Sequence, residues 1–444
     1  MVIGLGTLVV PLDSMVNVAF PDIVRSFGLP IPMIQWVVIA YVLSHASLML
    51  VFGRLGDMFG HRRIFLIGAA LSALAFVGCS LAPGYGWLLG ARVAQGIGAA
   101  LLLSCGTALA TFLFPEDQRA RALGLYTMIF GIGGAIGPPL AGVLVDLWGW
   151  RAVYAVRVPL CLLAFALAVR LPSAPPAGTR EAFDAPGAIW LTMAITAGLL
   201  AINQARDWSD NAWPVLALAG AAVLAGAAFI RQERRVAKPI IDVGLFRDAG
   251  FAVINLGNVL VNLAAFTVML LAPFYLSQVV GLSVIALGLV LACSPLGMTL
   301  SSPLAGWAAA RVPARRLLVA GAGMVAVSLA LVGQMAGLAV MLPALVLQGV
   351  GLGLYQVAYA EIVTRTLPRR ARGVAGSLAM MTRTLGTVSG AAVLMLAFTT
   401  ARGMAETAGL DGNAALSAGF RAAFLLAAAI TAGTAMLLLW RSPK

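Results

Sequence analysis

Apolar residues occur in long runs along this chain, separated by short stretches that carry its charged, glycine and proline residues. Each run has about 20 residues, the length that a helix needs to cross the hydrocarbon core of a bilayer. The pattern therefore predicts fourteen membrane-spanning helices and no sizeable extramembrane domain. Their ranges are 2–20, 33–52, 64–82, 87–112, 122–145, 152–170, 185–203, 212–230, 251–277, 284–308, 317–334, 338–361, 374–400 and 420–440.

Composition and charge agree with this pattern. Hydrophobic residues make up 61% of the 444 positions and charged residues 10%, whereas a soluble domain has about a quarter charged. Of the 29 lysines and arginines, 21 fall in segments on the same side as the 53–63 loop, five on the opposite side and three inside runs. The positive-inside rule predicts that the 53–63 side and both termini are cytoplasmic. The net charge of +13 thus reflects topology, and we expect no nucleic-acid partner.

The two halves of the chain resemble each other at an offset of 253 residues. The repeated features are Gly28-Leu29 with Gly281-Leu282, the loop 53–63 with 306–316, and QGIG at 95–98 with QGVG at 348–351. Parallel six-span repeats suit a secondary transporter, because alternating access requires two similar bodies that move about a central site. The resulting organisation is an N-terminal six-helix bundle (1–171), a cytoplasmic linker (172–184), two inserted transmembrane helices (185–231), a second cytoplasmic linker (232–250) and a C-terminal six-helix bundle (251–444).

Other function classes lack their expected residues. We find no HExxH motif and no paired catalytic carboxylates, so we expect no enzyme, no cofactor and no metal site. The four cysteines lie singly in apolar runs, where core packing explains them. A channel is disfavoured because the sequence has neither a filter-like loop nor a ring of charges.

Five stretches carry a family resemblance: LDSMVNVAFP (12–21), GRLGDMFGHRR (53–63), ARVAQGIGAA (91–100), GIGGAIGPPLAG (131–142) and LFRDAGFAVIN (245–255). With them the chain resembles the major facilitator superfamily, and specifically its fourteen-span drug:proton antiporter branch. The resemblance implies an all-α membrane protein with two six-helix bundles plus two extra central helices. It also implies a multi-pass protein of the bacterial cytoplasmic membrane.

Four ionisable residues in predicted spans are candidates for proton coupling: Asp13, Arg92, His45 and Glu361. An acid within a span costs about 2.5–3.5 kcal/mol on insertion scales, so Asp13 should face a cavity or a partner; an acid hydrated near the interface is the alternative. Arg92 corresponds to Leu345 in the second repeat, which favours a function over an interfacial anchor. The resemblance implies that Asp13 and Arg92 take part in proton transfer.

For the other two candidates, His45 and Glu361, a structural role is favoured over a role in proton transfer. His45 has serine neighbours and could be a second proton carrier, but a buried neutral histidine satisfied by a hydroxyl is favoured. Glu361 lies four residues before Arg365, so a solvated ion pair is favoured over a role in transport.

The loop between the second and third spans is a candidate gate made of Gly53, Arg54, Asp57, Gly60, Arg62 and Arg63. Its glycines permit a tight turn, and its arginines hold it on the cytoplasmic side. Asp57 can dock on a helix N-terminus or a basic residue in one conformation only. Because Ala310 takes its place in the second repeat, the turn itself does not need the acid. The resemblance implies that this loop steadies the outward-facing state.

The fifth span carries a motif formed by Gly133, Gly137, Pro138 and Gly142. The first two glycines make a small-xxx-small pair that permits close helix contact, and the proline bends the helix. Plain packing accounts for these residues. The resemblance implies the direction of transport, export, because this motif is typical of antiporters.

A substrate cavity is predicted to be lined by Asn17, Arg157, Asn255, Asn258, Asn262, Tyr355, Tyr359 and Arg383. Three of the asparagines recur at helical spacing, and such a stripe would be costly against lipid. Packing alone could explain the tyrosines. Arg157 stands where the family commonly has Asn, so anionic and neutral lipophilic substrates deserve the same weight as cations.

Two functions remain open. The leading hypothesis is a proton-coupled antiporter that exports hydrophobic small molecules or drugs by alternating access. The alternative is a secondary transporter dedicated to one metabolite or lipid. The expected partners are a lipophilic small-molecule substrate, protons and membrane lipid, and we expect a monomer.

Overall fold

The computed structural model describes residues 6, 8–112, 119–170, 184–204, 212–236, 244, 247–309, 311–335, 337–366 and 372–441. Within these ranges the chain forms helices joined by short connections, and no strand occurs in them. A helix satisfies its own backbone N–H and C=O groups, which lipid cannot do, so apolar runs of this length become helical. The predicted all-helical class is confirmed.

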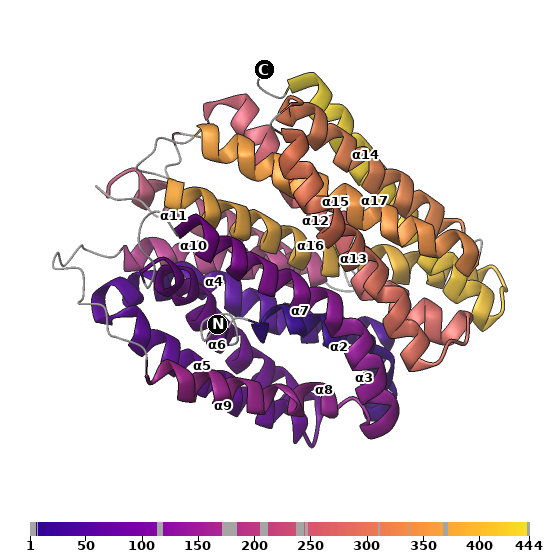
Figure 1. The fold of residues 1–444 in the computed structure, drawn as a ribbon. Helices are drawn as coiled ribbons and strands as arrows, with labels where there is room; N and C mark the ends of the chain where they lie inside the picture. The colour runs from indigo at the N-terminus through magenta and orange to yellow at the C-terminus, as the bar shows by residue number, and fades with distance from the viewer. Residues whose placement is uncertain are drawn as a thin grey trace. The chain divides into compact units, whose positions relative to one another are not determined.

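Two compact units make up the chain, and each is described by itself. Unit 1 comprises Met1–Ala194 and Val236–Ile240. Its helices run from indigo to magenta in Figure 1. They are η1 (Pro11–Asp13), α2 (Ser14–Val18), α3 (Phe20–Phe27), η2 (Ile31–Ile34), α4 (Gln35–Phe59), α5 (His61–Ser80), α6 (Tyr85–Phe112), α7 (Arg119–Trp148), α8 (Ala152–Ala155), α9 (Arg157–Ala168) and the first half of α10 (Ala185–Gln204).

Unit 2 comprises Ile195–Arg235 and Ile241–Lys444. It contains the rest of α10 and the helices α11 (Ala212–Glu233), α12 (Ala249–Phe274), the π-helix η6 (Tyr275–Val279), α13 (Val284–Ala309), α14 (Ala314–Gly333), α15 (Leu338–Thr366), α16 (Arg372–Thr407) and α17 (Gly412–Arg441). The boundary between the units falls inside α10. The predicted five-part division of the chain therefore stays a prediction.

Helices pair in the same order in the two units. In unit 1, η1 and α2 pack against α7, α4 packs against α6, and α5 packs against both α6 and α9. In unit 2, α12 packs against α16, α13 against α15, and α14 against both α15 and α17. The sequence offset of 253 residues therefore corresponds to a repeat of helix packing.

The repeated sequence motifs have physical causes in this packing. Gly28 and Gly281 each follow a helix, with φ of +60° and +74°, a left-handed conformation that favours glycine. Gly96 presses against the Tyr41 carbonyl on α4, and Gly349 presses against the Ser294 carbonyl on α13. A Cβ at either position would collide with backbone, so these two glycines permit equivalent close crossings.

By length and composition, fewer of the described helices qualify as membrane spans than the sequence predicts. Among the described residues, nine helices are long and apolar enough to cross a membrane, and the bent pair Phe20–Phe27 and Ile31–His45 would make ten. Three shorter apolar helices are Ile132–Trp148, Ala152–Ala168 and Ala185–Gly198. Helices lie at all fourteen predicted runs, but the total of fourteen spans remains to be established. Helical structure continues beyond the first predicted run, through α3 to Phe27.

Candidate functional site

A buried ion cluster in unit 1 joins three residues that are far apart in sequence. Asp13 Oδ1 accepts hydrogen bonds from Arg92 Nη1 at 2.7 Å and from Arg157 Nη1 at 2.9 Å. Asp13 Oδ2 accepts a further bond from Arg92 Nη2 at 2.9 Å. The two arginines are 1% and 0% exposed. One carboxylate therefore pairs with two buried guanidinium groups, and we call Asp13, Arg92 and Arg157 the ion cluster.

Arg92 is held on several sides by α4 and α6. Its Nε donates to the Val37 carbonyl at 2.9 Å, and its Nη1 also donates to Gln95 Oε1 at 2.8 Å. Its guanidinium carbon lies 4.4 Å from the centre of the Tyr41 ring, a cation–π geometry. This bonding satisfies a buried cation, whereas an arginine that serves as an interfacial anchor extends its head group towards water.

Arg157 begins α9 among aromatic rings. Its Nε donates to the Val153 carbonyl at 3.0 Å, and its guanidinium carbon lies 4.6 Å from the Phe76 ring and 5.2 Å from the Tyr154 ring. In the described part of the chain, neither Arg157 Nη2 nor the Tyr154 hydroxyl has a hydrogen-bond partner. Arg157 was predicted to line a substrate cavity, and the structure places it on Asp13.

Local backbone structure positions the carboxylate. Asp13 ends the 3₁₀ segment η1, which starts at Pro11 and runs into α2. Gly133 on α7 faces Leu8 and Pro11, and Gly137 faces the Ser14 hydroxyl so closely that a Cβ there would collide with it.

The rest of the fifth-span motif is equally enclosed. Pro138 and Gly142 are buried in α7. The motif thus forms the surface against which the Asp13 segment packs, as its small residues predicted.

Two residues of this site were not singled out from the sequence. Gln95 donates from Nε2 to Asp13 Oδ1 at 2.9 Å, and Tyr41 stacks on Arg92. Gln95 lies three residues after Arg92, on the same face of α6, so helical spacing from Arg92 could have found it. Tyr41 has no sequence signal of this kind, because α4 is placed beside α6 only in the folded unit.

Asn17 and His45 lie near the ion cluster. Asn17 follows Asp13 by one turn and is half-buried. His45 is 7% exposed and stacks on Tyr41 with ring centres 6.0 Å apart. Its Nε2 has no hydrogen-bond partner among the described residues, so the hydroxyl partner expected for a buried histidine is not seen at that atom.

The candidate gate joins α4 to α5. Gly60 turns the chain with φ of +93°, and Arg62 donates to the Ala168 carbonyl at 3.2 Å and to the Val169 carbonyl. These bonds tie the loop to the end of α9. Arg63 is exposed. The side chains of Gly53, Arg54 and Asp57 lie outside the described residues, so the Asp57 latch stays a prediction.

The predicted asparagine stripe of unit 2 forms a buried hydrogen-bond network. Asn255 Oδ1 accepts from the Tyr359 hydroxyl at 2.8 Å, and Asn258 Nδ2 donates to Thr382 Oγ1 at 2.8 Å. Asn262 Oδ1 accepts from Gln356 Nε2 at 3.1 Å. These bonds link α12 with α15 and α16. Asn255 and Asn258 are 2% and 0% exposed, so they face neighbouring helices and not an open surface.

The remaining predicted residues of unit 2 lie in different surroundings. Tyr355 is fully buried beside Gly257. Arg383 is exposed on α16, and Glu361 is half-buried near the end of α15. The Arg365 side chain, its predicted ion-pair partner, lies outside the described residues.

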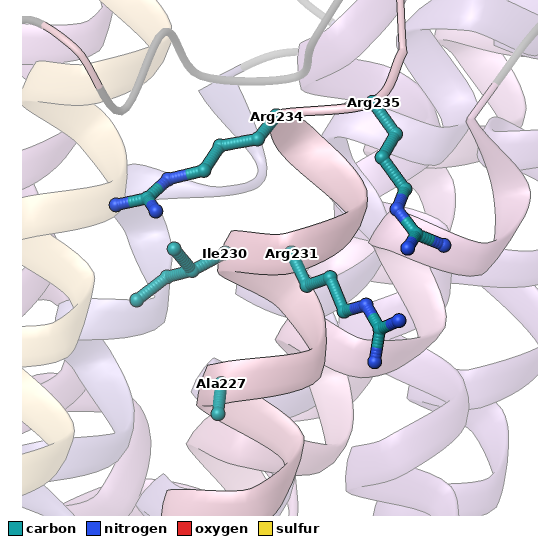
Figure 2. A pocket seen from close by; sticks show the side chains of 5 residues that line it. All are labelled: Ala227, Ile230, Arg231, Arg234 and Arg235. Carbon is teal, nitrogen blue, oxygen red and sulfur yellow. The ribbon is translucent and has the colours of Figure 1, made fainter.

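A basic pocket occurs at the end of α11. Figure 2 shows Arg231, Arg234 and Arg235 around it, with Ala227 and Ile230 forming its apolar part. The pocket encloses about 430 Å³. Arg234 and Arg235 lie at the start of the linker 232–250, which the sequence predicts to be cytoplasmic. The positive-inside rule places arginines on that side.

Comparison with known proteins decides the family. The sequence matches the Major Facilitator Superfamily over residues 3–236 and 254–444. The chain belongs to this superfamily. It is accordingly a multi-pass membrane transporter and not an enzyme.

Individual relatives agree with this assignment. The chain is 32% identical over 395 residues to the multidrug resistance protein Stp of Mycobacterium tuberculosis (strain CDC 1551 / Oshkosh), which covers 88% of this chain and 74% of that protein. It is 29% identical over 396 residues to the riboflavin transporter RibZ of Clostridioides difficile (strain 630), covering 88% and 86%. A bacterial homolog of the human lysosomal transporter Spinster, solved inward-facing and occupied, superposes with a TM-score of 0.73 at 17% identity over 99% of this chain and 94% of that one. The last likeness shows the fold alone.

Proposed function

We propose that this protein is a proton-coupled antiporter of the fourteen-span branch, which exports hydrophobic small molecules or drugs by alternating access. The observation that carries the proposal is the Asp13 carboxylate, enclosed in unit 1 by Arg92, Arg157 and Gln95. A partly buried carboxylate that is hydrogen-bonded to cations can take up and release a proton as its surroundings rearrange, and the Asp13 side chain is 15% exposed. The similarity to a multidrug resistance protein supports export.

The second support for antiport is the contact between the Gly133–Gly142 stretch of α7 and the segment that carries Asp13. A helix that crosses so closely moves together with its neighbour, because packed interfaces have few alternative arrangements. Proton binding at Asp13 would thus be transmitted to α7. This step gives the family motif a mechanical role beside its packing role.

The test uses purified protein in proteoliposomes loaded with cationic, neutral and anionic dyes. An imposed pH gradient should drive flux of at least one dye, and Asp13→Asn should lower the initial rate by at least tenfold with the same amount of protein in the membrane. An exposed acid at the end of α7, Asp146, gives the matched control Asp146→Asn, which should keep the wild-type rate. Flux that survives Asp13→Asn would refute the coupling role.

A transporter dedicated to one metabolite is the second candidate, and the similarity to a riboflavin transporter favours it. The two functions differ in breadth. A multidrug exporter should show competition among several unrelated dyes, whereas a dedicated transporter should be inhibited by one compound class only. Direction of flux under a fixed gradient separates export from uptake.

A further inference from the structure

The two arginines of the ion cluster are not equally dependent on Asp13. Arg92 has two anchors that do not involve the carboxylate, the Val37 carbonyl and the Gln95 side chain. It also lies over the Tyr41 ring. If Asp13 lost its charge, these contacts would still hold Arg92 in place.

Arg157 depends on Asp13 much more. Its Nε bond goes to Val153, in the α8 segment that leads directly into α9. In the described part of the chain, its one polar contact with another span is the 2.9 Å bond from Nη1 to Asp13, and Nη2 has no acceptor. A buried guanidinium with an unpaired donor has a strong drive to find an acceptor. Apart from its contacts with the Phe76 and Tyr154 rings, Arg157 is therefore held against another described span by the Asp13 charge.

We propose that Arg157 is a positioning residue for proton coupling, whose ion pair with Asp13 joins α9 to η1 while the carboxylate is ionised and opens when Asp13 takes up a proton. Arg157 thereby sets the pH at which the proton is taken up. The inference rests on the proposed function, since it makes Asp13 the site of the coupling proton.

The titratable groups around Asp13 determine how strongly the loss of Arg157 should change proton uptake. The titratable groups that face it are Tyr41 and His45 on α4, Cys79 on α5, Arg92 on α6, Tyr154 on α8 and Arg157 on α9. The described part of α7 that touches this segment contributes glycines and no charge. Of these groups, the two arginines alone carry a full charge at about pH 7 when their pKa values are the ordinary ones. Removing Arg157 therefore removes one of the two cations that stabilise the carboxylate.

Infrared difference spectroscopy of the full-length protein in lipid nanodiscs can test the proposal. The C=O stretch of a protonated Asp13 is identified by its absence in Asp13→Asn. In Arg157→Gln, this band should appear at a pH at least about one unit higher than in wild type, because an adjacent opposite charge shifts a carboxylate by about 1–3 units. Arg157→Met, which suits the Phe76 and Tyr154 rings, gives a second neutral variant if the Gln variant does not fold.

Two controls separate positioning from general stability. Arg157→Lys keeps the charge and should restore most of the wild-type midpoint. Arg151→Gln removes a neighbouring arginine that bonds to the Ala82 carbonyl and stacks on Trp150, so its midpoint should not move. An unchanged midpoint in both neutral Arg157 variants, or an equal shift in Arg151→Gln, overturns the proposal.

A transport measurement on the same variants distinguishes this inference from the proposed function. The pH at half-maximal flux in proteoliposomes should shift to higher pH in Arg157→Gln by the same amount as the infrared midpoint. If the infrared midpoint differs between wild type and Arg157→Gln but wild type shows no gradient-driven flux, proton-coupled export is refuted and the proposal for the Arg157 ion pair stands. Gradient-driven flux with an identical pH profile in wild type and Arg157→Gln refutes the role of Arg157.

Discussion

Arg157 and Asp13 are 144 residues apart in the sequence, yet Arg157 Nη1 donates to Asp13 Oδ1 at 2.9 Å. This bond links the last helix of the first predicted bundle to its first segment. The same oxygen also accepts from Arg92 and Gln95. The acid of span 1 is therefore the meeting point of three helices, and several predictions concern the groups that surround it.

Gln95 should matter for transport more than its counterpart in the second repeat. Gln95 bonds to both Asp13 and Arg92, whereas Gln348 donates to the Ala265 backbone carbonyl at 3.0 Å. We expect Gln95→Ala to lower gradient-driven flux about tenfold, because the Asp13 carboxylate loses a donor and Arg92 loses an acceptor. A tenfold loss of rate corresponds to about 1.4 kcal/mol. Gln348→Ala should lower thermal stability by about 1 kcal/mol and keep flux within twofold. Equal loss of flux in both variants would contradict a special role for Gln95.

Steric contact between α7 and the Asp13 segment should be visible in glycine substitutions. A Cβ at Gly137 would collide with the Ser14 hydroxyl, whereas at Gly134 nothing lies within 4 Å of the added atom. We expect Gly137→Val to destabilise the protein by about 1–3 kcal/mol and to abolish flux, as overpacking does. Gly134→Val is the matched control and should retain flux. Thermal unfolding in detergent and initial flux rates are the measurements, and similar behaviour of the two variants would show that the close crossing is not needed.

The network of unit 2 should contribute stability through Thr382. Its hydroxyl accepts from Asn258 and lies 3.2 Å from the Tyr359 hydroxyl. Thr382→Val removes the 2.8 Å acceptor of the buried Asn258 amide and leaves it the Ala379 carbonyl at 3.5 Å, so we expect a loss of about 1–3 kcal/mol in thermal unfolding. Thr387→Val, one or two turns further along α16, removes a hydroxyl that bonds only to the Arg383 carbonyl among described residues and should cost less than half as much. A larger loss in Thr387→Val would argue against the network.

Asp57 should act in transport and not in folding. The second repeat has Ala310 at the equivalent position in the sequence, so we expect the acid to be dispensable for folding of this segment. Asp57→Asn should reduce flux at least fivefold, because it weakens a contact that exists in one conformation of the transporter only. A fivefold change corresponds to about 1 kcal/mol in the free-energy difference between the two conformations. Membrane abundance, measured by quantitative immunoblot, should stay at the wild-type level. Normal flux at normal abundance would remove the gate hypothesis.

Much of the helical fold could be predicted from the sequence because hydrophobicity is a local property. Nine of the described helices are long and apolar enough to span a bilayer, and a helix is the form in which such a run satisfies its own backbone. The 253-residue repeat was also visible, since turns and close crossings leave glycines at fixed positions. Gly28 and Gly281 show this directly, because both adopt the positive φ that ends a helix.

The sequence does not predict which polar side chains of different helices contact one another inside the bundle. Asp13 and Arg92 were recognised one at a time, since each is a charge in an apolar run, but their shared contact with Arg157 was not. The asparagines of span 9 are predicted to line a cavity, and the sequence does not show that side chains of two neighbouring helices, α15 and α16, hydrogen-bond to them.

The sequence by itself thus predicted most of the helical segments, the glycines that the repeat requires and the need of charges such as Asp13 and Arg92 for partners. The tertiary structure decided which of those groups meet. The physical reason is that burial cost depends on the residue and its immediate neighbours in the chain, whereas neutralisation of a buried charge depends on atoms within about 3 Å that packing brings from distant helices. For Asp13, one of those atoms belongs to Arg157.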